Sequence, residues 1–529
     1  MIIAQNTAQQ QLVKEHQTTS ASLAGKSGAP VQASGAPRSA PCAPSTCGRR
    51  LVDCYGQTYP SRYNVFIPIK GGRRLVYNAF TGKLTVWAAR GVDVYNNFAA
   101  MPCTEDKKAI ADQLLDGGYL VRKGQDQYAE IKKVYETNRF NPKRMTLSIA
   151  PTMSCNFSCD YCFQGDRKAK AVMKPEVQDA LVAFVEKSMD KLNHLHTAWY
   201  GGEPMLRWQT IYSLADRLID LCNANGVNYS AMMVTNGYLL TQKKAERLYR
   251  RRVKTIQITL DGPPEQHNKR RSLKGGGPTF DSVVENIKKI VGVIPIRIAV
   301  RINVDARNCD LASMDRLFRI LVDNGLANQK NFGVYFAPVE AITKECHQIA
   351  DSVLAKEAYA NMELELYRMA IRKKVAGHRY PPRFFGTCAA VRPNGYVVLP
   401  DGAMHKCWDT ISSGENAVGS VFDTDKVPDN EVYKKWLDWS PFNIEECKQC
   451  VLLPNCAGAC AYKMLYHKDT AEGQRKAPCL SWRYQIKTYL LMWAISRKII
   501  SIDDVLLTDR TAKSVEKGNT APAGGSSGK

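Results

Sequence analysis

From residue 145 onward, short apolar and β-branched runs alternate with longer segments in which apolar residues recur at helical spacing. Strands are predicted at 145–150, 196–200, 229–235, 254–260, 296–304 and 331–337, and helices at 174–190, 208–224, 241–251, 280–291, 311–324 and 351–375. This alternation is typical of a parallel sheet with crossover helices. Six repeats predict an α/β fold, a partial (β/α)6 barrel, with active residues at the carboxyl ends of the strands.

The rest of the chain divides around this barrel. Residues 1–58 and 510–529 are rich in Ala, Ser, Gly and Pro, a composition that buries too little apolar surface to fold, so we predict a disordered arm and tail. Residues 59–140 predict a small module of hairpin strands followed by helices. We place the barrel at 141–345, a bridging helix in 346–380, a cysteine-rich domain at 381–490 and a C-terminal helix at 491–509.

The loop after the first predicted strand of the barrel contains three closely spaced cysteines. Cys155, Cys159 and Cys162 lie in the run Ser-Cys-Asn-Phe-Ser-Cys-Asp-Tyr-Cys-Phe-Gln-Gly. Three thiols at this spacing can ligate three irons of one iron–sulfur cube, whose fourth iron then takes a ligand from elsewhere. The alternative is a zinc knuckle, although structural zinc sites normally have four protein ligands.

The run Tyr-Gly-Gly-Glu-Pro follows the second predicted strand and ends at Pro204. Its glycines, Gly201 and Gly202, allow a close backbone approach to a ligand, and Glu203 offers an acceptor to an ammonium group. Together with the cysteine loop, this run resembles the radical S-adenosylmethionine (radical SAM) superfamily. The resemblance implies a [4Fe-4S] cluster at the three cysteines, with SAM on its fourth iron. It also implies SAM contacts from Tyr161, Gly201, Gly202, Glu203, Pro204, Thr259, Arg271 and Arg301.

A second group of seven cysteines follows the bridging helix: Cys388, Cys407, Cys447, Cys450, Cys456, Cys460 and Cys479. Their order resembles the SPASM extension of radical SAM enzymes, which holds auxiliary iron–sulfur clusters. The resemblance assigns Cys447, Cys450, Cys456 and Cys479 to one cluster and Cys388, Cys407 and Cys460 to another. No cysteine lies in 379–387, so the second cluster has an open site, takes Cys346 or another ligand, or is smaller. Two zinc ribbons, with His405 as a possible ligand, are the alternative.

The resemblance implies an activity as well as cofactors. A 5′-deoxyadenosyl radical abstracts hydrogen from the substrate, which in this group is usually a ribosomally made peptide or a protein, leading to a crosslink or an oxidised side chain. A flavodoxin or ferredoxin is the implied reductant. Asp409 and Asp401 are candidate acceptors for the proton that leaves the substrate.

Two other functions compete with this interpretation. The first is a sulfatase maturase that makes formylglycine, although such enzymes carry an aspartate directly after the cysteine matching Cys407, where Trp408 stands here. The second is a zinc-ribbon protein that binds nucleic acid, for which the net charge of +23 would supply phosphate affinity. The aromatic and basic motifs of RNA-binding modules are absent from the sequence, and we do not expect a nucleic-acid partner.

Composition narrows the setting. The chain has 17 cysteines, of which ten are in metal-type spacings, and this favours thiolates in a reducing cytoplasm over disulfides. No apolar run of about eighteen residues occurs, so no membrane span is expected. The module at 59–140 loosely resembles leader-peptide recognition domains of radical SAM maturases. Lys70, Arg73 and Arg74 would there form a patch for an acidic leader.

Overall fold

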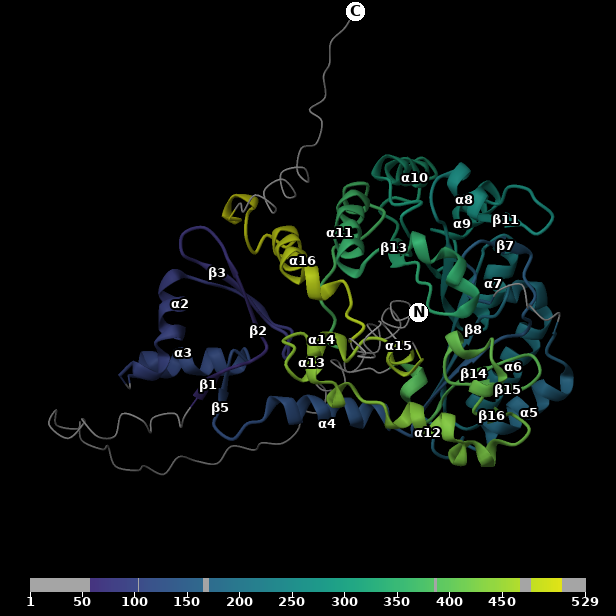
Figure 1. Cartoon of the computed structure of the whole chain (residues 1–529), viewed down its shortest axis with the longest axis horizontal. Helices are drawn as coiled ribbons and strands as arrows, with labels where there is room; N and C mark the ends of the chain where they lie inside the picture. The colour runs from purple at the N-terminus through teal and green to yellow at the C-terminus, as the bar shows by residue number, and fades with distance from the viewer. Residues whose placement is uncertain (1–57, 103, 165–170, 385–387, 467–476, 507–529) are drawn as a thin grey trace, which may run out of the picture. The chain divides into compact units, whose positions relative to one another are not determined.

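The structure is a computed structural model that describes residues 58–102, 104–164, 171–384, 388–466 and 477–506 (Figure 1). The predicted disordered arm, apart from residue 58, and the predicted tail lie outside the described residues. The chain divides into two compact units. The first comprises residues 1–131 and 499–506, and the second comprises 132–498 and 507–529.

The first unit contains a small antiparallel sheet of order β2-β3-β4, formed by Asn64–Pro68, Arg74–Asn78 and Leu84–Trp87. Helices α2 (Ala89–Asn96) and α3 (Glu105–Asp116) follow, and β1 (Thr58–Pro60) pairs with β5 (Leu120–Arg122). The core includes Val76, Trp87, Tyr95 and Tyr119. Hairpin strands followed by helices were predicted here. Helix α4 (Gln127–Arg139), which crosses the boundary between the units, was not predicted because its few apolar positions give only a weak periodic signal.

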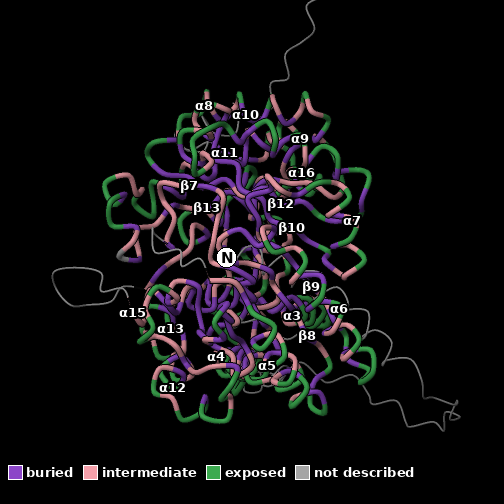
Figure 2. The backbone as a smooth tube through the Cα atoms, turned by 90° about the vertical axis from the view of Figure 1, so that its right-hand side faces the viewer, coloured by how far each residue is buried: buried purple, intermediate pink, exposed green. Residues whose placement is uncertain are grey.

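The second unit is built on a nine-stranded sheet of order β13-β12-β10-β9-β8-β6-β14-β15-β16. Its first six strands are parallel neighbours, as the sequence predicts. They are β6 (Arg144–Ile149), β8 (His194–Trp199), β9 (Asn228–Thr235), β10 (Val253–Thr259), β12 (Arg297–Val304) and β13 (Phe332–Pro338). The helices between and after them are α5 (Pro175–Glu186), α6 (Trp208–Ala224), α7 (Gln242–Arg250), α8 (Pro264–Arg270), α9 (Phe280–Ile290), α10 (Leu311–Asp323) and α11 (Lys356–Arg372). Figure 2 shows much of β10 and β12 as buried.

The cysteine-rich region extends the barrel sheet. Strand β14 (Gly395–Val398) pairs in parallel with β6, and β15 (Ala403–His405) and β16 (Gly419–Ser420) continue the sheet antiparallel. This pairing was not predicted, because a strand of four residues gives little periodic signal. Its consequence is that the seven-cysteine region and the three-cysteine loop are attached to adjacent strands of one sheet.

Two elements differ in their bounds from the sequence predictions. The bridging helix α11 begins at Lys356, after the 3-10 helix η4 (Lys344–Ser352), instead of at residue 351. The last long helix, α16, is Trp482–Ser496, so it crosses the boundary we placed between 490 and 491. No helix among the described residues is both long and apolar enough to cross a membrane.

Candidate functional site

The three-cysteine loop leaves the sheet at the carboxyl end of β6. Within the loop, β7 (Phe157–Cys159) pairs with β11 (Arg271–Leu273), which places Arg271 opposite Cys159. Phe157 is fully buried and anchors the β7–β11 strand pair. The residues Cys155, Cys159 and Cys162, in contrast, are partly exposed. The loop is therefore held by its backbone while its thiols stay accessible to a ligand.

The glycine turn after β8 is fastened to this loop by backbone hydrogen bonds. The Gly202 N–H donates to Thr152 O at 3.1 Å, and the Glu203 N–H donates to Ser154 O at 2.8 Å. A Cβ atom on Gly202 would lie 2.2 Å from Ser154 O and 2.3 Å from Met153 O, which no side chain can do without a shift. The Gly-Gly sequence is thus required for the turn to touch the cysteine loop.

Glu203 is fully buried and accepts three hydrogen bonds. The donors are Met205 N–H at 2.9 Å, Thr235 Oγ1 at 2.6 Å and Asn236 N–H at 2.7 Å. Burial raises the pKa of Glu203, and the hydrogen bonds oppose that shift. A carboxylate has about four acceptor positions. One position therefore remains for an ammonium donor, which is compatible with the predicted contact to SAM.

Tyr161 lies at the centre of a polar network at the carboxyl ends of the strands. Its hydroxyl hydrogen-bonds Asp261, and it accepts from Arg271 Nη1 at 2.5 Å and from Asn303 Nδ2 at 3.1 Å. Burial raises the pKa of Tyr161 well above its ordinary value. The Arg301 Nε donates to Asn303 Oδ1 at 2.6 Å. The structure thus joins three of the predicted SAM-contact residues, Tyr161, Arg271 and Arg301, through Asp261 and Asn303.

Sequence reasoning missed part of this network. Asp261, Asn303 and Asp305 were not among the predicted site residues. Asp305 is fully buried and pairs with Arg270, whose Nη2 lies 2.9 Å from Asp305 Oδ2. The positions of these three missed residues in the sequence could have identified them. They lie at or just after the carboxyl ends of predicted parallel strands, where the active residues of such a barrel are found. Thr259, the last residue of β10, is buried at this edge, but no hydrogen bond of its side chain is recorded.

Four thiols of the second region interact with one another. Burial, together with the neighbouring charges of Cys447, Cys479 and Cys450, raises the pKa of Cys456 to about 12. Burial likewise raises the pKa of Cys447 to about 12, with Cys479 and Cys450 acting in the same direction. We call Cys447, Cys450, Cys456 and Cys479 the four-thiol group. The sequence assigns these same four cysteines to one predicted cluster.

The remaining three thiols of this region form a separate group. Burial raises the pKa of Cys407, and Asp409, Cys460 and Cys388 add to the shift. Burial also raises the pKa of Cys460, to about 11. We call Cys388, Cys407 and Cys460 the three-thiol group. Cys346 is nearer to the first loop, because its thiol donates to Tyr161 O at 3.6 Å and interacts with Cys162.

The donor chemistry of these groups fits iron–sulfur clusters. Seven thiols gather in two mutually interacting sets, and buried thiols that raise one another's pKa are stabilised when a metal cluster binds them as thiolates. Among the residues that the structure describes, no three His, Cys, Asp or Glu side chains are arranged to hold a single metal ion. The fit to clusters accordingly rests on burial and on the interactions among the thiols.

The two predicted proton acceptors differ in their surroundings. Asp409 is partly buried, its Oδ2 accepts from Cys407 Sγ at 3.5 Å, and burial raises its pKa. Asp401 is exposed in the turn between β14 and β15, where its Oδ1 accepts from Ala403 N–H at 3.0 Å. Asp401 therefore acts as a turn-capping residue here, and only Asp409 remains a candidate acceptor.

An aromatic contact connects the two cysteine regions. The rings of Tyr200, directly before the glycine turn, and Trp408, directly after Cys407, have centroids 4.0 Å apart. Phe163, directly after Cys162, stacks on Tyr200 with centroids 6.5 Å apart. Trp408, where sulfatase maturases carry an aspartate, thus occupies the space between the two cysteine regions, and Asp409 follows it.

Comparison with known proteins identifies relatives of this architecture. Residues 149–304 match the sequence model of the radical SAM superfamily. The radical SAM cyclopropyl synthase TigE of Paramaledivibacter caminithermalis is 21% identical over 400 residues, covering 70% of this chain and 79% of TigE. A cysteine-type anaerobic sulfatase-maturating enzyme of Clostridium perfringens is 26% identical over 353 residues, covering 60% of this chain and 88% of that enzyme.

A solved structure shares the fold. The structure of native anSMEcpe with bound AdoMet superposes with a TM-score of 0.53 and 19% identity, covering 67% of this chain and 100% of that one. The same protein with bound AdoMet and Cp18Cys peptide gives a TM-score of 0.52 at 18% identity. At this level of identity the likeness shows the fold, which agrees with the partial barrel described above.

Proposed function

We propose that this chain, which belongs to the radical SAM superfamily, modifies side chains of a ribosomally made peptide by crosslinking or oxidising them. The observation that carries the proposal is the contact between the three-cysteine loop and the glycine turn at the carboxyl edge of a parallel sheet. Two further thiol groups lie on the same unit, as expected for a maturase with auxiliary clusters.

The residues of the loop and the strand ends have separable roles. When bound at Cys155, Cys159 and Cys162, a [4Fe-4S] cluster with SAM supplies a 5′-deoxyadenosyl radical after one-electron reduction. Glu203 accepts a hydrogen bond from the SAM amino group at its remaining acceptor position. Tyr161, fixed by its hydroxyl hydrogen bonds, keeps its place in the loop, and Asp409 takes the proton that leaves the substrate.

A direct experiment measures metal content and SAM cleavage. We expect anaerobically purified protein to contain up to about twelve irons, as three cubes would require, and to release 5′-deoxyadenosine from SAM with dithionite. Mass spectrometry of peptides encoded beside its gene, incubated with the enzyme and SAM, should show a loss of two hydrogens. About two zincs without 5′-deoxyadenosine release would overturn the proposal and restore the nucleic-acid-binding alternative.

The second candidate is formylglycine formation in a sulfatase, and the similarity to the sulfatase-maturating enzyme of Clostridium perfringens supports it. Trp408 argues against it, because it stands where the sulfatase maturases carry their aspartate. Incubation with a cysteine-type sulfatase peptide separates the two candidates. We expect SAM cleavage without formylglycine, whereas clean conversion of that peptide would replace the crosslinking proposal.

We further propose that the first unit binds the leader part of the peptide. Strands β2 and β4 are the edges of its sheet, and an extended peptide can add to such an edge. Of the predicted basic patch, Arg73 is paired with Asp504, Arg74 lies over the Phe66 ring, and Lys70 is exposed. Lys70 is therefore the basic residue best placed to meet an acidic leader.

Binding can be tested on the full chain with a fluorescein-labelled peptide of alternating glutamate and leucine. We expect Lys70→Glu to weaken its binding several-fold at low salt, through lost charge complementarity. Lys123→Glu, another exposed lysine of the same unit, serves as the matched control. Equal affinities for wild type and both variants would reject the first unit as the leader site.

A further inference from the structure

Three basic side chains gather at Lys406, which directly precedes one ligand of the three-thiol group. Arg139 ends α4, Arg392 precedes β14, and Lys406 directly precedes Cys407. Arg139 and Lys406 are each only 2% exposed, and Arg392 is partly buried. Electrostatic interactions connect Cys388 with both Arg392 and Lys406, and Lys406 with both arginines. We call Arg139, Arg392 and Lys406 the cation cluster.

The hydrogen bonds of the cation cluster supply no negative charge. Arg139 donates from Nε to Val391 O at 2.7 Å and from Nη2 to Trp436 O at 3.2 Å and Leu437 O at 2.5 Å. The Lys406 Nζ donates to Arg392 O at 2.6 Å and to Gly395 O at 2.7 Å. Among the described residues, none of the three cations forms an ion pair with a carboxylate. Carbonyl oxygens satisfy the donors but carry no negative charge. Burial lowers the pKa of Lys406, and the negative charge of the Cys388 thiolate opposes that shift, so a cluster at Cys388 favours the charged form of the lysine.

The charges around the cluster are unevenly distributed. Arg139 interacts with the carboxylates of Glu136 and Asp438, which offset part of its charge. Arg392 has Arg144 and Cys388 as its charged neighbours beside Lys406, and its Nη2 is buried without a hydrogen-bond partner. A buried guanidinium nitrogen without an acceptor is unfavourable and needs an explanation. An anionic group at Cys388 would provide one.

We propose that the cation cluster makes the reduction potential of the iron–sulfur group at Cys388, Cys407 and Cys460 more positive than that of the four-thiol group. This inference rests on the ligand assignment made above. Positive charges in a poorly screened interior stabilise the form that holds one additional electron. Asp409, beside Cys407, opposes them. Glu136 and Asp438 offset part of the charge of Arg139, which leaves Arg392 and Lys406 as the cations that act on Cys388.

The four-thiol group offers the contrast. Its recorded cationic partner is Arg483, whose Nη1 donates to Cys479 Sγ at 3.2 Å, and Arg483 is exposed. Solvent screens an exposed charge far more than a buried one. The three-thiol group is therefore the better electron acceptor of the two, and it is also the group connected to the glycine turn through Trp408 and Tyr200.

The test is a redox titration followed by electron paramagnetic resonance in the Cys155→Ala/Cys159→Ala/Cys162→Ala background, which removes the first cluster. Loss of one signal on Cys388→Ala assigns that signal to the three-thiol group. In Arg392→Gln and in Lys406→Met, we expect the one-electron reduction constant of this signal to fall about tenfold, a shift of about 59 mV to more negative potential. The signal of the four-thiol group should not move.

Two further variants separate charge from structure. Arg392→Lys retains the charge and should restore the potential, while Lys434→Gln removes an exposed charge on α12 (Glu431–Asp438) and should change neither signal. Unchanged potentials in Arg392→Gln and Lys406→Met overturn the inference, as does iron loss that Arg392→Lys fails to rescue. Protein that binds zinc and gives no iron signal would overturn the assignment of Cys388, Cys407 and Cys460 as cluster ligands. An iron signal whose potential does not shift would overturn only the proposed effect of the cation cluster.

Discussion

The two cysteine regions of the second unit hold the same side chain in different surroundings. Cys155, Cys159 and Cys162 are partly exposed and lie on a loop that reaches out from the sheet. In the second region, Cys407 and Cys447 are buried and the other five cysteines are partly exposed, and burial raises the pKa of most thiols there. A cluster that binds SAM needs an open iron and an approach path, whereas an auxiliary cluster needs neither. Exposure alone does not separate the two roles here, so we assign them from the position of the first loop at the carboxyl ends of the parallel strands.

The most severe test of this comparison removes the exposed thiols. In Cys155→Ala/Cys159→Ala/Cys162→Ala we expect the loss of about four irons and of all 5′-deoxyadenosine release, because one cube loses its ligands. Iron analysis and chromatography of the reaction measure both quantities. Residual SAM cleavage in this variant would place the reactive cluster elsewhere.

Removing a thiol of the four-thiol group should affect stability more than SAM cleavage. In Cys456→Ala we expect the loss of up to about four irons and a lower melting temperature, because metal binding is coupled to folding of the ligand region. Uncoupled 5′-deoxyadenosine release should stay within about threefold of wild type if the two regions act as independent sites. Thermal denaturation and SAM cleavage are measured on the same preparation, and full loss of cleavage would show that the regions are not separable.

A smaller change tests the contact that holds the loop. In Gly202→Ala the new methyl group would meet Ser154 O at 2.2 Å, so the loop or the turn must shift, with a strain of about 1–3 kcal/mol. We expect 5′-deoxyadenosine release to fall about tenfold or more while the iron of the second region is retained. Gly414→Ala is the control, because nothing lies within 4 Å of its added methyl group. Equal activities of the two variants would contradict the proposed role of the turn.

The smallest effect concerns the amino-terminal half of β8, away from the cysteine loop at the carboxyl ends of the strands. His194 Nε2 and His196 Nδ1 both contact Ser230 Oγ, at 2.7 and 2.8 Å, and burial lowers the pKa of each histidine from 6.5 to about 4. Because the folded pKa lies below the unfolded one, the stability is fully present above about pH 6.5 and is lost as the pH falls toward about 4.

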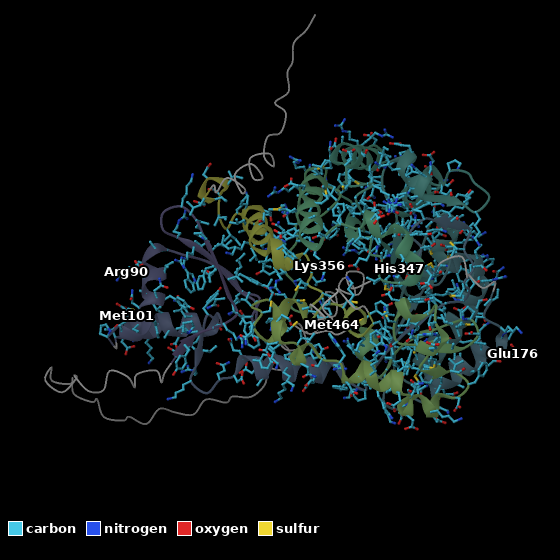
Figure 3. All side chains as sticks on the ribbon, viewed as in Figure 1. Arg90, Met101, Glu176, His347, Lys356 and Met464 are labelled. Atoms are coloured by element: carbon cyan, nitrogen blue, oxygen red, sulfur yellow. The ribbon has the colours of Figure 1, made fainter. Side chains whose placement is uncertain are left out.

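The loss should amount to about 1.4 kcal/mol per pH unit for each histidine within that range. Urea denaturation at pH 5 and pH 7 should show a smaller difference in His196→Gln than in wild type. His347→Gln is the matched control, since His347 is exposed on η4 (Figure 3). A pH dependence that is the same in all three proteins would show that His196 is not buried as a neutral ring.

Much of the fold follows from local pattern. The six parallel strands lie within one or two residues of their predicted positions, because apolar strands separated by amphipathic helices leave few other arrangements. The short pairs could not be predicted, since β7 and β11 have three residues each and β14 has four. Their pairing depends on contacts between residues more than a hundred positions apart, which no local pattern encodes.

By itself, the sequence determined the chemistry that the chain can hold. It shows ten cysteines in two groups, of three and seven, and, after a strand, a glycine turn that contains Glu203. Only the tertiary structure decided which groups work together. It separated Asp409 from the exposed Asp401, joined Tyr161 to Asp261 and Asn303, and brought Arg392 and Lys406 to Cys388. The physical reason is that the spacing of ligands is a property of the local sequence. The burial of a side chain and the charges around it depend on which distant segments the sheet brings together.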